Sequence, residues 1–176
     1  QAWTKDIPVV CGTTGWDAAS LMAEAEQTGQ ILVWKSNFSV GVNLFFGMNR
    51  YLAEQMNSLP QYTPAVTETH HIHKLDAPSG TAISMAKDAI EELDRKEGWT
   101  LAGESVTVAE EAIAITSIRE GEVAGIHEVV YDSSIDTITL SHSAKSRRGL
   151  AVGAVLAAEF LQGKKGYYTM KELLAE

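Results

Sequence analysis

The spacing of apolar residues predicts alternating strands and helices in the first part of the chain. The apolar runs at 7–11 and 31–34 have the length of buried strands, and turn-type residues follow each of them. Between them, an aspartate can cap a helix over residues 17–28, which Gly29 ends. A longer helix over 40–56 is apolar on more than one side. This order of strand, helix, strand and helix is typical of an α/β unit.

After the long helix the pattern changes to β runs with a single helix among them. Residues 62–70 are β-like, and apolar residues recur at helical spacing over about 79–95. Three further β runs follow, at 112–118, 123–131 and 135–142. The turn-type residues 120–122 and 132–134 separate these runs at the spacing of hairpins. The pattern predicts a mixed sheet of at least four strands with helices, an α+β fold.

Two more helices are predicted at the carboxyl end. One is an alanine-rich run over 149–161, and the other opens at Thr169, which has with Glu172 the spacing of a capping box. The basic residues 145–148 lie between the last strand and these helices. They are either a solvated charge run, or they place Arg147 where it steers an anion toward a site.

Composition and charge narrow the classes of partner. The 176 residues suffice for one sizeable core or two smaller layers, and 14 basic against 23 acidic residues give a net charge of −9. We do not expect such a protein to bind nucleic acid or an anionic membrane. Cys11 is the only cysteine, so no disulfide framework is expected, and we interpret it as a buried thiol. With no signal peptide and no apolar run of bilayer length, we expect a cytoplasmic protein.

The candidate chemistry is concentrated in residues 68–82, Glu-Thr-His-His-Ile-His-Lys-Leu-Asp-Ala-Pro-Ser-Gly-Thr-Ala. His70 and Lys74 share a face whether this segment is extended or helical, whereas His71 needs a bend to join them. After the Pro-Ser-Gly-Thr turn a helix begins, and the first N–H groups of a helix bind anions. Imidazole and ammonium groups facing such N–H groups describe a pocket for a small carboxylated substrate with a proton donor.

Simpler interpretations of the histidines stay open at this point. A single histidine beside a turn is usually structural or solvated. His70, His71 and His73 could also bind a metal, but adjacent ligands are awkward to aim at one ion, and no cysteine or carboxylate cluster completes a shell. His127 and His142 lie within predicted strands, and we interpret them as hydrogen-bonded sheet residues.

The sequence His-His-x-His-Lys-x-Asp-Ala-Pro-Ser-Gly-Thr-Ala resembles the signature of the dihydrodipicolinate reductases, enzymes of lysine and diaminopimelate biosynthesis, and the resemblance extends over residues 8–172. It implies that His70 is the acid/base residue and that Lys74 is a second proton donor or polarises the substrate. Three further residues would hold the dicarboxylate, namely His71, Gly80 and Thr81. The implied reaction is the reduction of dihydrodipicolinate (4-hydroxy-tetrahydrodipicolinate) to tetrahydrodipicolinate by NADH or NADPH.

The resemblance also places the cofactor beside the first two strands. The Gly-Thr-Thr-Gly sequence at 12–15 is on its own a common turn, but it resembles the loop of this family that lines the nicotinamide. Residues 35–39 resemble a second lining segment, although a lysine stands at 35 where the family often has alanine. The implied cofactor-binding residues are Gly12, Thr13, Thr14, Lys35, Ser36, Asn37 and Phe38.

No glycine-rich dinucleotide-binding pattern precedes these segments. We therefore expect the carboxy-terminal portion of a longer reductase. In it, residues 1–40 are a remnant of an α/β Rossmann cofactor domain, residues 41–145 are the substrate-binding and oligomerisation domain, and residues 146–176 are helices that return to the cofactor domain. The resemblance implies a homotetramer assembled through the sheet. Two alternatives are a non-catalytic dicarboxylate-binding or tetramerisation fragment and a metal-dependent hydrolase that uses the histidines.

Overall fold

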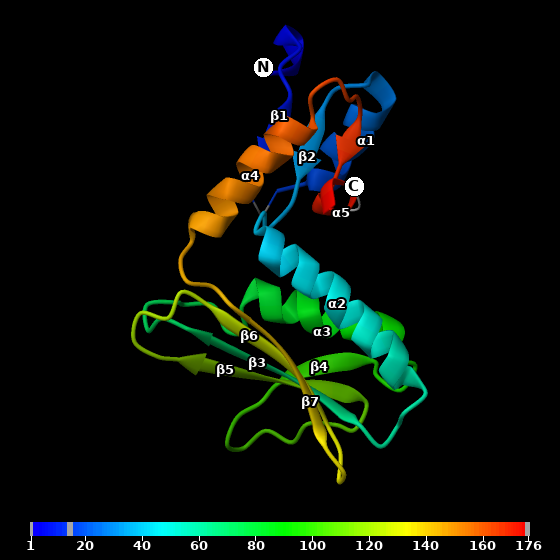
Figure 1. Ribbon diagram of the computed structural model, residues 1–176, viewed down its shortest axis with the longest axis vertical. Coiled ribbons are helices and arrows are strands. Elements are labelled where there is room, and N and C mark those ends of the chain that lie inside the picture. Colours follow the sequence, from blue (N-terminus) through cyan, green and yellow to red (C-terminus); the bar gives the residue numbers. More distant parts are fainter. Residues whose placement is uncertain (1, 14–15, 175–176) are drawn as a thin grey trace. The chain divides into compact units, whose positions relative to one another are not determined.

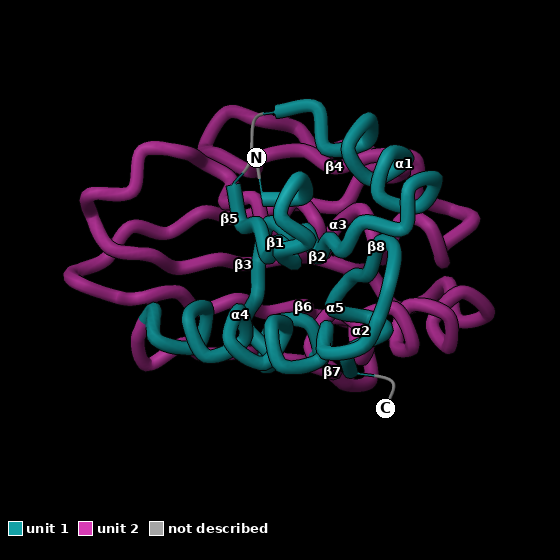
Figure 2. The backbone as a smooth tube through the Cα atoms, turned by 90° about the horizontal axis from the view of Figure 1, so that it is seen from above, with its two compact units in different colours: residues 1–44, 147–176 teal, residues 45–146 magenta. Residues whose placement is uncertain are grey.

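The computed structural model describes residues 2–13 and 16–174, and the chain divides into two compact units. Residues 1–44 and 147–176 form unit 1, and residues 45–146 form unit 2 (Figure 2). Each unit has its own sheet and its own cluster of buried apolar residues.

Unit 1 is built on a small parallel sheet with helices around it (Figure 1). Its strands, in the order β1-β2-β8, are Val9–Cys11, Leu32–Trp34 and Tyr167–Tyr168. Its helices are η1 (Trp3–Lys5), α1 (Ala18–Thr28), the first residues of α2 (Val40–Asn57), α4 (Arg148–Phe160) and α5 (Met170–Leu174). The parallel pairing of β1 with β2 confirms the predicted α/β unit. The sequence pattern missed β8, which has only two residues.

Local capping signals begin and end the helices of unit 1. Asp17 accepts a hydrogen bond from the Ser20 N–H at 3.3 Å and caps α1, which ends at Gly29 with a φ of 70°. At the start of α5, the Thr169 N–H donates to Glu172 Oε2 at 2.7 Å, as a capping box requires. The predicted cap of α1, its end and the capping box are therefore confirmed.

A close backbone contact fixes helix α4 within unit 1. One core cluster of the unit consists of Val33, Phe38, Ala157, Leu161 and Met170. Gly153 lies so close to the Phe38 carbonyl that a Cβ atom at position 153 would stand 1.7 Å from the oxygen. Only glycine allows this approach, so α4 packs directly on the backbone that follows β2.

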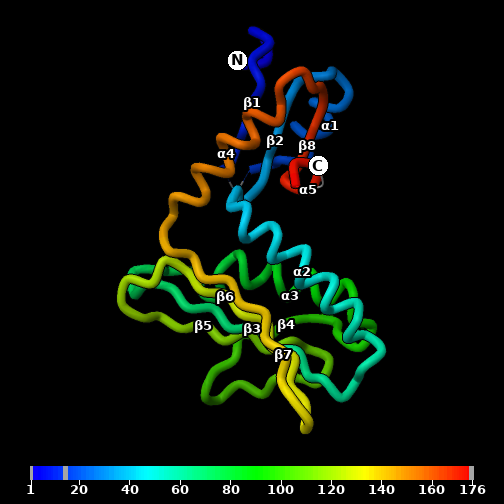
Figure 3. The backbone as a smooth tube through the Cα atoms, viewed as in Figure 1, coloured from blue at the N-terminus to red at the C-terminus, as the bar shows by residue number. Residues whose placement is uncertain are grey.

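Unit 2 is built on a mixed sheet of five strands in the order β4-β5-β3-β6-β7 (Figure 3). The strands are β3 (Thr63–His70), β4 (Gly98–Leu101), β5 (Ala112–Arg119), β6 (Ile126–Asp132) and β7 (Thr137–Ser143). Strand β3 is central, because it pairs parallel with β5 and antiparallel with β6. The predicted mixed sheet with helices is confirmed, and so is the predicted hairpin between β6 and β7.

The connection between β5 and β6 differs from the prediction. Residues 120–122 do not join a hairpin, because β3 lies between β5 and β6 in the sheet. The chain instead crosses the carboxyl end of β3, where the Glu120 N–H donates to the His70 carbonyl and the His71 N–H donates to the Val123 carbonyl, both at 2.8 Å. The short spacing between β5 and β6 suggested that they pair with each other, whereas each of them pairs with β3, which is distant in sequence.

Two boundaries near the middle of unit 2 also differ. Helix α3 is Gly80–Glu92, shorter than the predicted 79–95, and the sequence pattern missed β4. Strand β4 has four residues, begins with a glycine and pairs only with β5 at the edge of the sheet. Such a short edge strand shows too little alternation to be recognised from its sequence.

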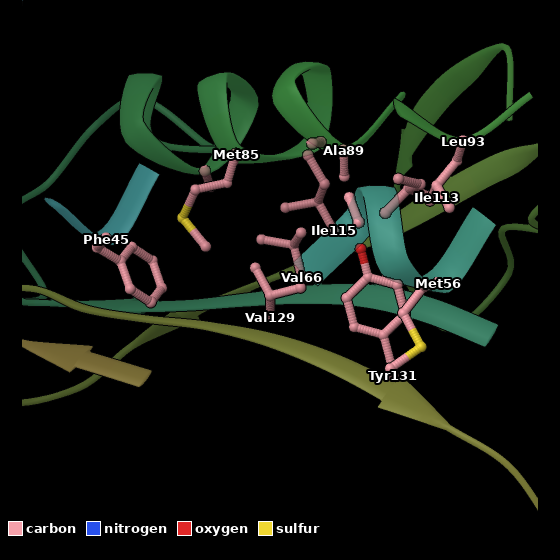
Figure 4. Close-up of a cluster of buried hydrophobic side chains, with 13 residues drawn as sticks. Phe45, Met56, Val66, Met85, Ala89, Leu93, Ile113, Ile115, Val129 and Tyr131 are labelled. Carbon is pink, nitrogen blue, oxygen red and sulfur yellow. The ribbon is translucent and has the colours of Figure 1, made fainter. Parts of the chain in front are cut away.

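Helices cover one face of this sheet, as Figure 1 shows for α3 and the second part of α2. The core lies between the helices and the sheet, where Phe45 of α2 and Met85 of α3 meet Val66 and Val129 of the strands (Figure 4). The alternation of buried and less buried residues along β3 and β6 follows from this one-sided cover.

The opposite face carries no helix within residues 45–146, all of which are described; we call it the open face. Most of its side chains are small, including Ala65, Thr67, Thr69, Ala114, Thr116, Thr139 and Ser141. The alternation predicted for the last strand, polar on one side and apolar on the other, matches this division.

Candidate active site

At the carboxyl end of β3, the covered face of the sheet changes from apolar to polar. Because side chains alternate along a strand, Glu68 and His70 follow Val66 on the covered face. The strand register places His127 of β6 opposite Glu68, and Arg119 of β5 opposite His70. Glu68, His70 and His127 are all buried. A cluster of titratable side chains therefore lies at the start of the histidine-lysine stretch.

His70 is held through its Nδ1 atom. This atom is hydrogen-bonded to Glu68 Oε2, and Glu68 Oε1 accepts a hydrogen bond from Arg119 Nη2 at 2.9 Å. Burial acts to raise the pKa of Glu68, but the hydrogen bonds from Arg119 and His70 outweigh it and leave this pKa lowered. The carboxylate is thus ionised at neutral pH and only accepts hydrogen bonds. The proton of this bond is therefore on Nδ1, and Nε2 is the nitrogen left for a ligand.

A glycine leaves room beside Nε2 of His70. Gly125 has a φ of 148°, and a Cβ atom there would stand 3.0 Å from Nε2. A side chain at this position would therefore be strained and would press on the imidazole ring. Burial lowers the pKa of His70, and the charges of Lys74 and Arg119 act in the same direction, against Glu68.

Lys74 is the second residue predicted to act in catalysis. Its positive charge acts to lower the pKa of His70. Lys74 Nζ donates to both carboxylate oxygens of Asp76, at 2.7 and 2.8 Å. A carboxylate that binds to Lys74 would therefore have to share or displace this ion pair.

The start of α3 is connected to the same cluster. Ser79 caps the helix through its Oγ atom, which also lies 3.1 Å from His127 Nε2. The Ser79 N–H donates to Glu68 Oε1 at 3.3 Å. Within the described residues, no acceptor is found for the N–H groups of Gly80 and Thr81. These two groups lie in the first turn of the helix and can bind an anion, as the sequence predicted.

His71 and His73 form a separate pair. Their ring centroids are 6.0 Å apart, and His73 Nε2 lies 3.1 Å from Glu122 Oε1 at the exposed surface. His71 Nδ1 is buried and has no hydrogen-bond partner in the part of the chain that the structure describes. His71 is thus joined to His73 by a ring contact, and its unpartnered nitrogen is a group that a bound carboxylate could satisfy.

Two residues of the cluster had no role in the sequence interpretation, Glu68 and Arg119. Glu68 stands two positions before His70, and alternation in a strand was the signal that could have placed both on one face. Arg119 had no such signal, because only the register of β5 brings it to His70. Arg119 Nη2 also donates to the Asp76 carbonyl at 2.7 Å, so it ties the loop before α3 to Glu68.

His127 is a hydrogen-bonded sheet residue, as its position in a strand suggested. Burial lowers its pKa to about 4, with the neighbouring His70 acting in the same direction. His127 is therefore neutral at pH 7, and its Nε2 can accept the hydrogen bond of the Ser79 hydroxyl. His142, the other strand histidine, has a buried Nδ1 without a hydrogen-bond partner among the described residues.

In unit 1, the segments expected to bind a cofactor lie at the carboxyl ends of β1 and β2. These strands are parallel neighbours, so residues 12–13 and 35–38 emerge at one edge of the sheet, where ligands bind in such folds. The segments also touch, since a Cβ atom at Gly12 would stand 3.6 Å from the Phe38 ring. The Asn37 Nδ2 atom finds no acceptor within the described residues and can donate to a carboxamide. These features fit a nicotinamide.

Individual residues of these segments contribute differently. The side chain of Phe38 belongs to the core of unit 1, so this residue can offer a ligand its backbone but not an open ring face. Ser36 is exposed and Lys35 is half-buried, whereas Thr14 lies outside the described residues. Cys11 is half-buried, not buried as the sequence suggested.

Three further points of the sequence analysis concern Arg147, a metal site and a membrane-spanning helix. Arg147 is exposed and immediately precedes α4. Among the described residues, no group of three or more histidine, cysteine, aspartate or glutamate side chains is arranged to hold a metal ion. None of the helices in the described ranges is long and apolar enough to cross a membrane.

Comparisons with known proteins show what the chain resembles. Residues 41–174 match the family model for the C-terminus of dihydrodipicolinate reductase. The chain is 45% identical over 172 residues to a 4-hydroxy-tetrahydrodipicolinate reductase of Christiangramia forsetii, covering 97% of this chain and 70% of that protein. It is 36% identical over 182 residues to the protein of the same name from Neisseria gonorrhoeae, covering 97% of this chain and 64% of that protein.

A solved structure has the same fold. It is a dipicolinate-bound dihydrodipicolinate reductase from Paenisporosarcina sp. TG-14, which aligns with a TM-score of 0.75 and 23% identity. The alignment covers 96% of this chain and 64% of that one. The chain thus spans 64% to 70% of the length of these relatives.

Proposed function

Because the chain belongs to the dihydrodipicolinate reductase family, we propose that it forms the substrate-binding part of a 4-hydroxy-tetrahydrodipicolinate reductase. The reaction is the reduction of 4-hydroxy-tetrahydrodipicolinate to tetrahydrodipicolinate with NADH or NADPH, a step of lysine and diaminopimelate biosynthesis. One observation carries the proposal: at the end of β3, His70 Nδ1 is bonded to Glu68, and the other oxygen of this carboxylate accepts from the Ser79 N–H at the start of α3.

The ligand of this site is a small dicarboxylate. Two kinds of donor support this choice, the N–H groups of Gly80 and Thr81 and the buried, unpartnered nitrogen of His71. Lys74 adds a positive charge that an anion could use if it shares or displaces the ion pair with Asp76. The relative from Paenisporosarcina binds dipicolinate, a molecule of this class.

The residues of the chain supply the proton chemistry. His70 donates a proton from Nε2, since Nδ1 is bonded to the ionised Glu68 carboxylate. Lys74 polarises the substrate or donates a second proton. When bound, the nicotinamide supplies a hydride. Its site is lined by residues that follow β1 and β2, namely Gly12, Thr13, Thr14, Lys35, Ser36, Asn37 and Phe38.

The open face of the five-stranded sheet supports an assembly of identical chains. Most of its side chains are small and no helix of residues 45–146 lies over them, so a second sheet could pack closely there. We propose a homotetramer in the cytoplasm, without nucleic acid or membrane as partner. Sedimentation equilibrium of the full-length protein would show four times the mass of one chain, and a monomer at micromolar concentration would contradict the assembly.

The proposed function is tested in the full-length protein with two variants of the site. We expect His70→Gln to lower kcat by about 10²- to 10⁴-fold, the usual loss for a general acid, while dipicolinate still binds in calorimetry. Lys74→Ala should lower kcat comparably and also weaken dipicolinate binding, because it removes a charge that the anion needs. The measurements are the oxidation of NADH and of NADPH in the presence of the substrate.

A matched control is His73→Gln, which changes an exposed histidine of the same stretch. Its kcat should stay within about twofold of the wild type, because the ring lies outside the polar cluster. If His70→Gln turned over within a few-fold of the wild type, His70 would lose its role. Dipicolinate binding without turnover in the wild type would favour the non-catalytic alternative, and no binding at all would reject the site.

A further inference from the structure

The Glu68 carboxylate contacts three parts of the candidate active site. Its Oε2 atom is bonded to His70, the proposed proton donor. Its Oε1 atom accepts from the Ser79 N–H at 3.3 Å, at the start of the proposed anion-binding helix. The same oxygen accepts from Arg119 at 2.9 Å, and Arg119 holds the Asp76 carbonyl at 2.7 Å.

The chemistry of these contacts requires a carboxylate. All three partners are N–H donors, and they approach both oxygens of a side chain that is fully buried. An amide of the same shape has only one acceptor oxygen, and its NH₂ group would face an N–H group of His70 or of Arg119. With an amide at this position, all of these contacts can be satisfied only if the proton of His70 moves from Nδ1 to Nε2, so it is the carboxylate that holds His70 in the Nδ1 tautomer.

We propose that Glu68 is a positioning residue, which fixes the tautomer and orientation of His70 and couples this proton donor to the anion-binding start of α3. The proposal rests on the proposed function, because it assumes that His70 delivers a proton from Nε2. Glu68 does not itself contact the substrate, and it acts through His70, Arg119 and Ser79.

The charges around His70 give the proposal a signature that a purely structural role would not have. The titratable and charged groups that face His70 are Glu68 on the same strand, Arg119 on β5, His127 on β6 and Lys74 after β3. Of these, Glu68 alone is negative. Without its charge, Arg119 and Lys74 would lower the pKa of His70 further, so a smaller fraction of His70 would be protonated at neutral pH.

The test compares Glu68→Gln, Glu68→Asp and Glu122→Gln in the full-length protein. Glu122 also pairs with a histidine, at 3.1 Å from His73, but this pair is exposed, so Glu122→Gln makes the same chemical change outside the cluster. For Glu68→Gln we expect kcat to fall by about 10²- to 10⁴-fold, the effect of a misplaced or wrongly tautomerised imidazole. We also expect the alkaline limb of the pH profile of kcat to move to lower pH.

Glu68→Asp should recover part of the lost activity, because it keeps the negative charge while shortening the side chain. Glu122→Gln should leave kcat and its pH profile within about twofold of the wild type. A Glu68→Gln protein that folds and keeps both kcat and the alkaline limb of the wild type would overturn the proposal.

A second measurement does not depend on activity. Nitrogen NMR of ¹⁵N-histidine-labelled protein reports which nitrogen of neutral His70 carries the proton. We expect the proton on Nδ1 in the wild type and on Nε2 in Glu68→Gln. A wild-type His70 with its proton on Nε2 would overturn the proposal, even if Glu68→Gln failed to fold. If the Nδ1 tautomer is found but the protein does not reduce the substrate, the positioning geometry stands and the proposed function fails.

Discussion

The covered face of the sheet in unit 2 changes character between two adjacent rows of side chains. In one row, Val66 of β3 lies beside Ile115 of β5 and Val129 of β6, and all three are buried. In the next row, Glu68 lies beside His127, and these two are buried as well. The body of α3 packs on the apolar row, whereas its N-terminal cap bonds to the polar row. Burial is the same in the two rows, but its consequences are opposite.

The apolar row stabilises the fold, since each Å² of apolar surface removed from water contributes about 25 cal/mol. The polar row is expensive to bury unless every donor and acceptor is paired. Both oxygens of Glu68 are paired, with three partners in all, and His127 is paired at Nε2 with the Ser79 hydroxyl. The comparison teaches that a strand anchored by its apolar residues can hold adjacent polar residues in a fixed geometry, which a loop alone would not do.

The largest expected effect on stability is in the apolar row. Ile115→Ala should lower the free energy of unfolding by about 2–5 kcal/mol, because it removes buried methyl groups and leaves a cavity. We expect the kcat of the protein that remains folded to stay near the wild-type value. Urea unfolding followed by circular dichroism measures the first quantity, and assays well below the melting temperature measure the second.

The control is the same replacement at Ile118, on the same strand but on the open face and 40% exposed. Ile118→Ala should lower the free energy of unfolding of a single chain by less than about 1 kcal/mol, because less apolar area returns to water. In a single chain, equal losses at both positions would contradict the division of the sheet into a covered and an open face; in the assembled protein they would mean that assembly buries the open face.

A second effect should appear in the polar row as a dependence of stability on pH. His127 has a pKa of about 4 in the folded chain, against 6.5 for an ordinary histidine. As pH falls below 6.5 the unfolded chain binds the proton first, so stability is complete above pH 6.5 and is lost down to about pH 4. The shift corresponds to a loss of about 3 kcal/mol, which should be smaller in His127→Gln.

Urea unfolding at a series of pH values between 7 and 4 measures this loss. His70 and Glu68, whose pKa values are also lowered, contribute in the same direction, so His127→Gln should reduce the slope without abolishing it. A slope unchanged by His127→Gln would show that His127 is hydrated in the folded protein.

Local signals in the sequence located α1 to α5, although not the end of α3, but they did not give the order of the strands. Asp17 and Gly29 delimit α1, and Ser79 caps α3, because capping depends on residues only a few positions apart. The crossing of residues 120–125 over the end of β3 could not be predicted in this way, since it depends on which distant strand pairs with β3. The short edge strand β4 carried no pattern at all.

The same distinction between local signals and long-range strand pairing applies to the residues of the candidate site. His70, Lys74, Gly80 and Thr81 stand within one short stretch, and the sequence alone suggested their grouping. Arg119 entered the site only through the strand register, and the ring contact of His71 with His73 depends on a turn that the alternation rule did not describe. Residues that create the chemistry were thus visible locally. Of the residues that orient them, Glu68 stood in the same stretch but was given no role, and Arg119 was brought in by long-range pairing.

The smallest expected effect on the free energy of unfolding concerns the Tyr131 hydroxyl, a polar group in the apolar core. The hydroxyl of Tyr131 is buried in the core, where Figure 4 shows it near Ile115, and it has no hydrogen-bond partner among the described residues. Burial raises the pKa of Tyr131 to about 12, in keeping with an apolar environment. Tyr131→Phe should therefore leave the free energy of unfolding unchanged or raise it by up to about 1 kcal/mol, because an unpaired polar group is removed.

The matched control is Tyr62→Phe, which removes a hydroxyl that donates to Asp136 Oδ1 at 2.7 Å at the surface. This change should cost up to about 1 kcal/mol in urea unfolding, since a hydrogen bond is lost. The two replacements delete the same atom, which is buried and unpaired in Tyr131 and paired at the surface in Tyr62, so opposite effects on stability are expected. A loss of more than about 1 kcal/mol in Tyr131→Phe would place an ordered water beside the hydroxyl, and the apolar row would then not be dry.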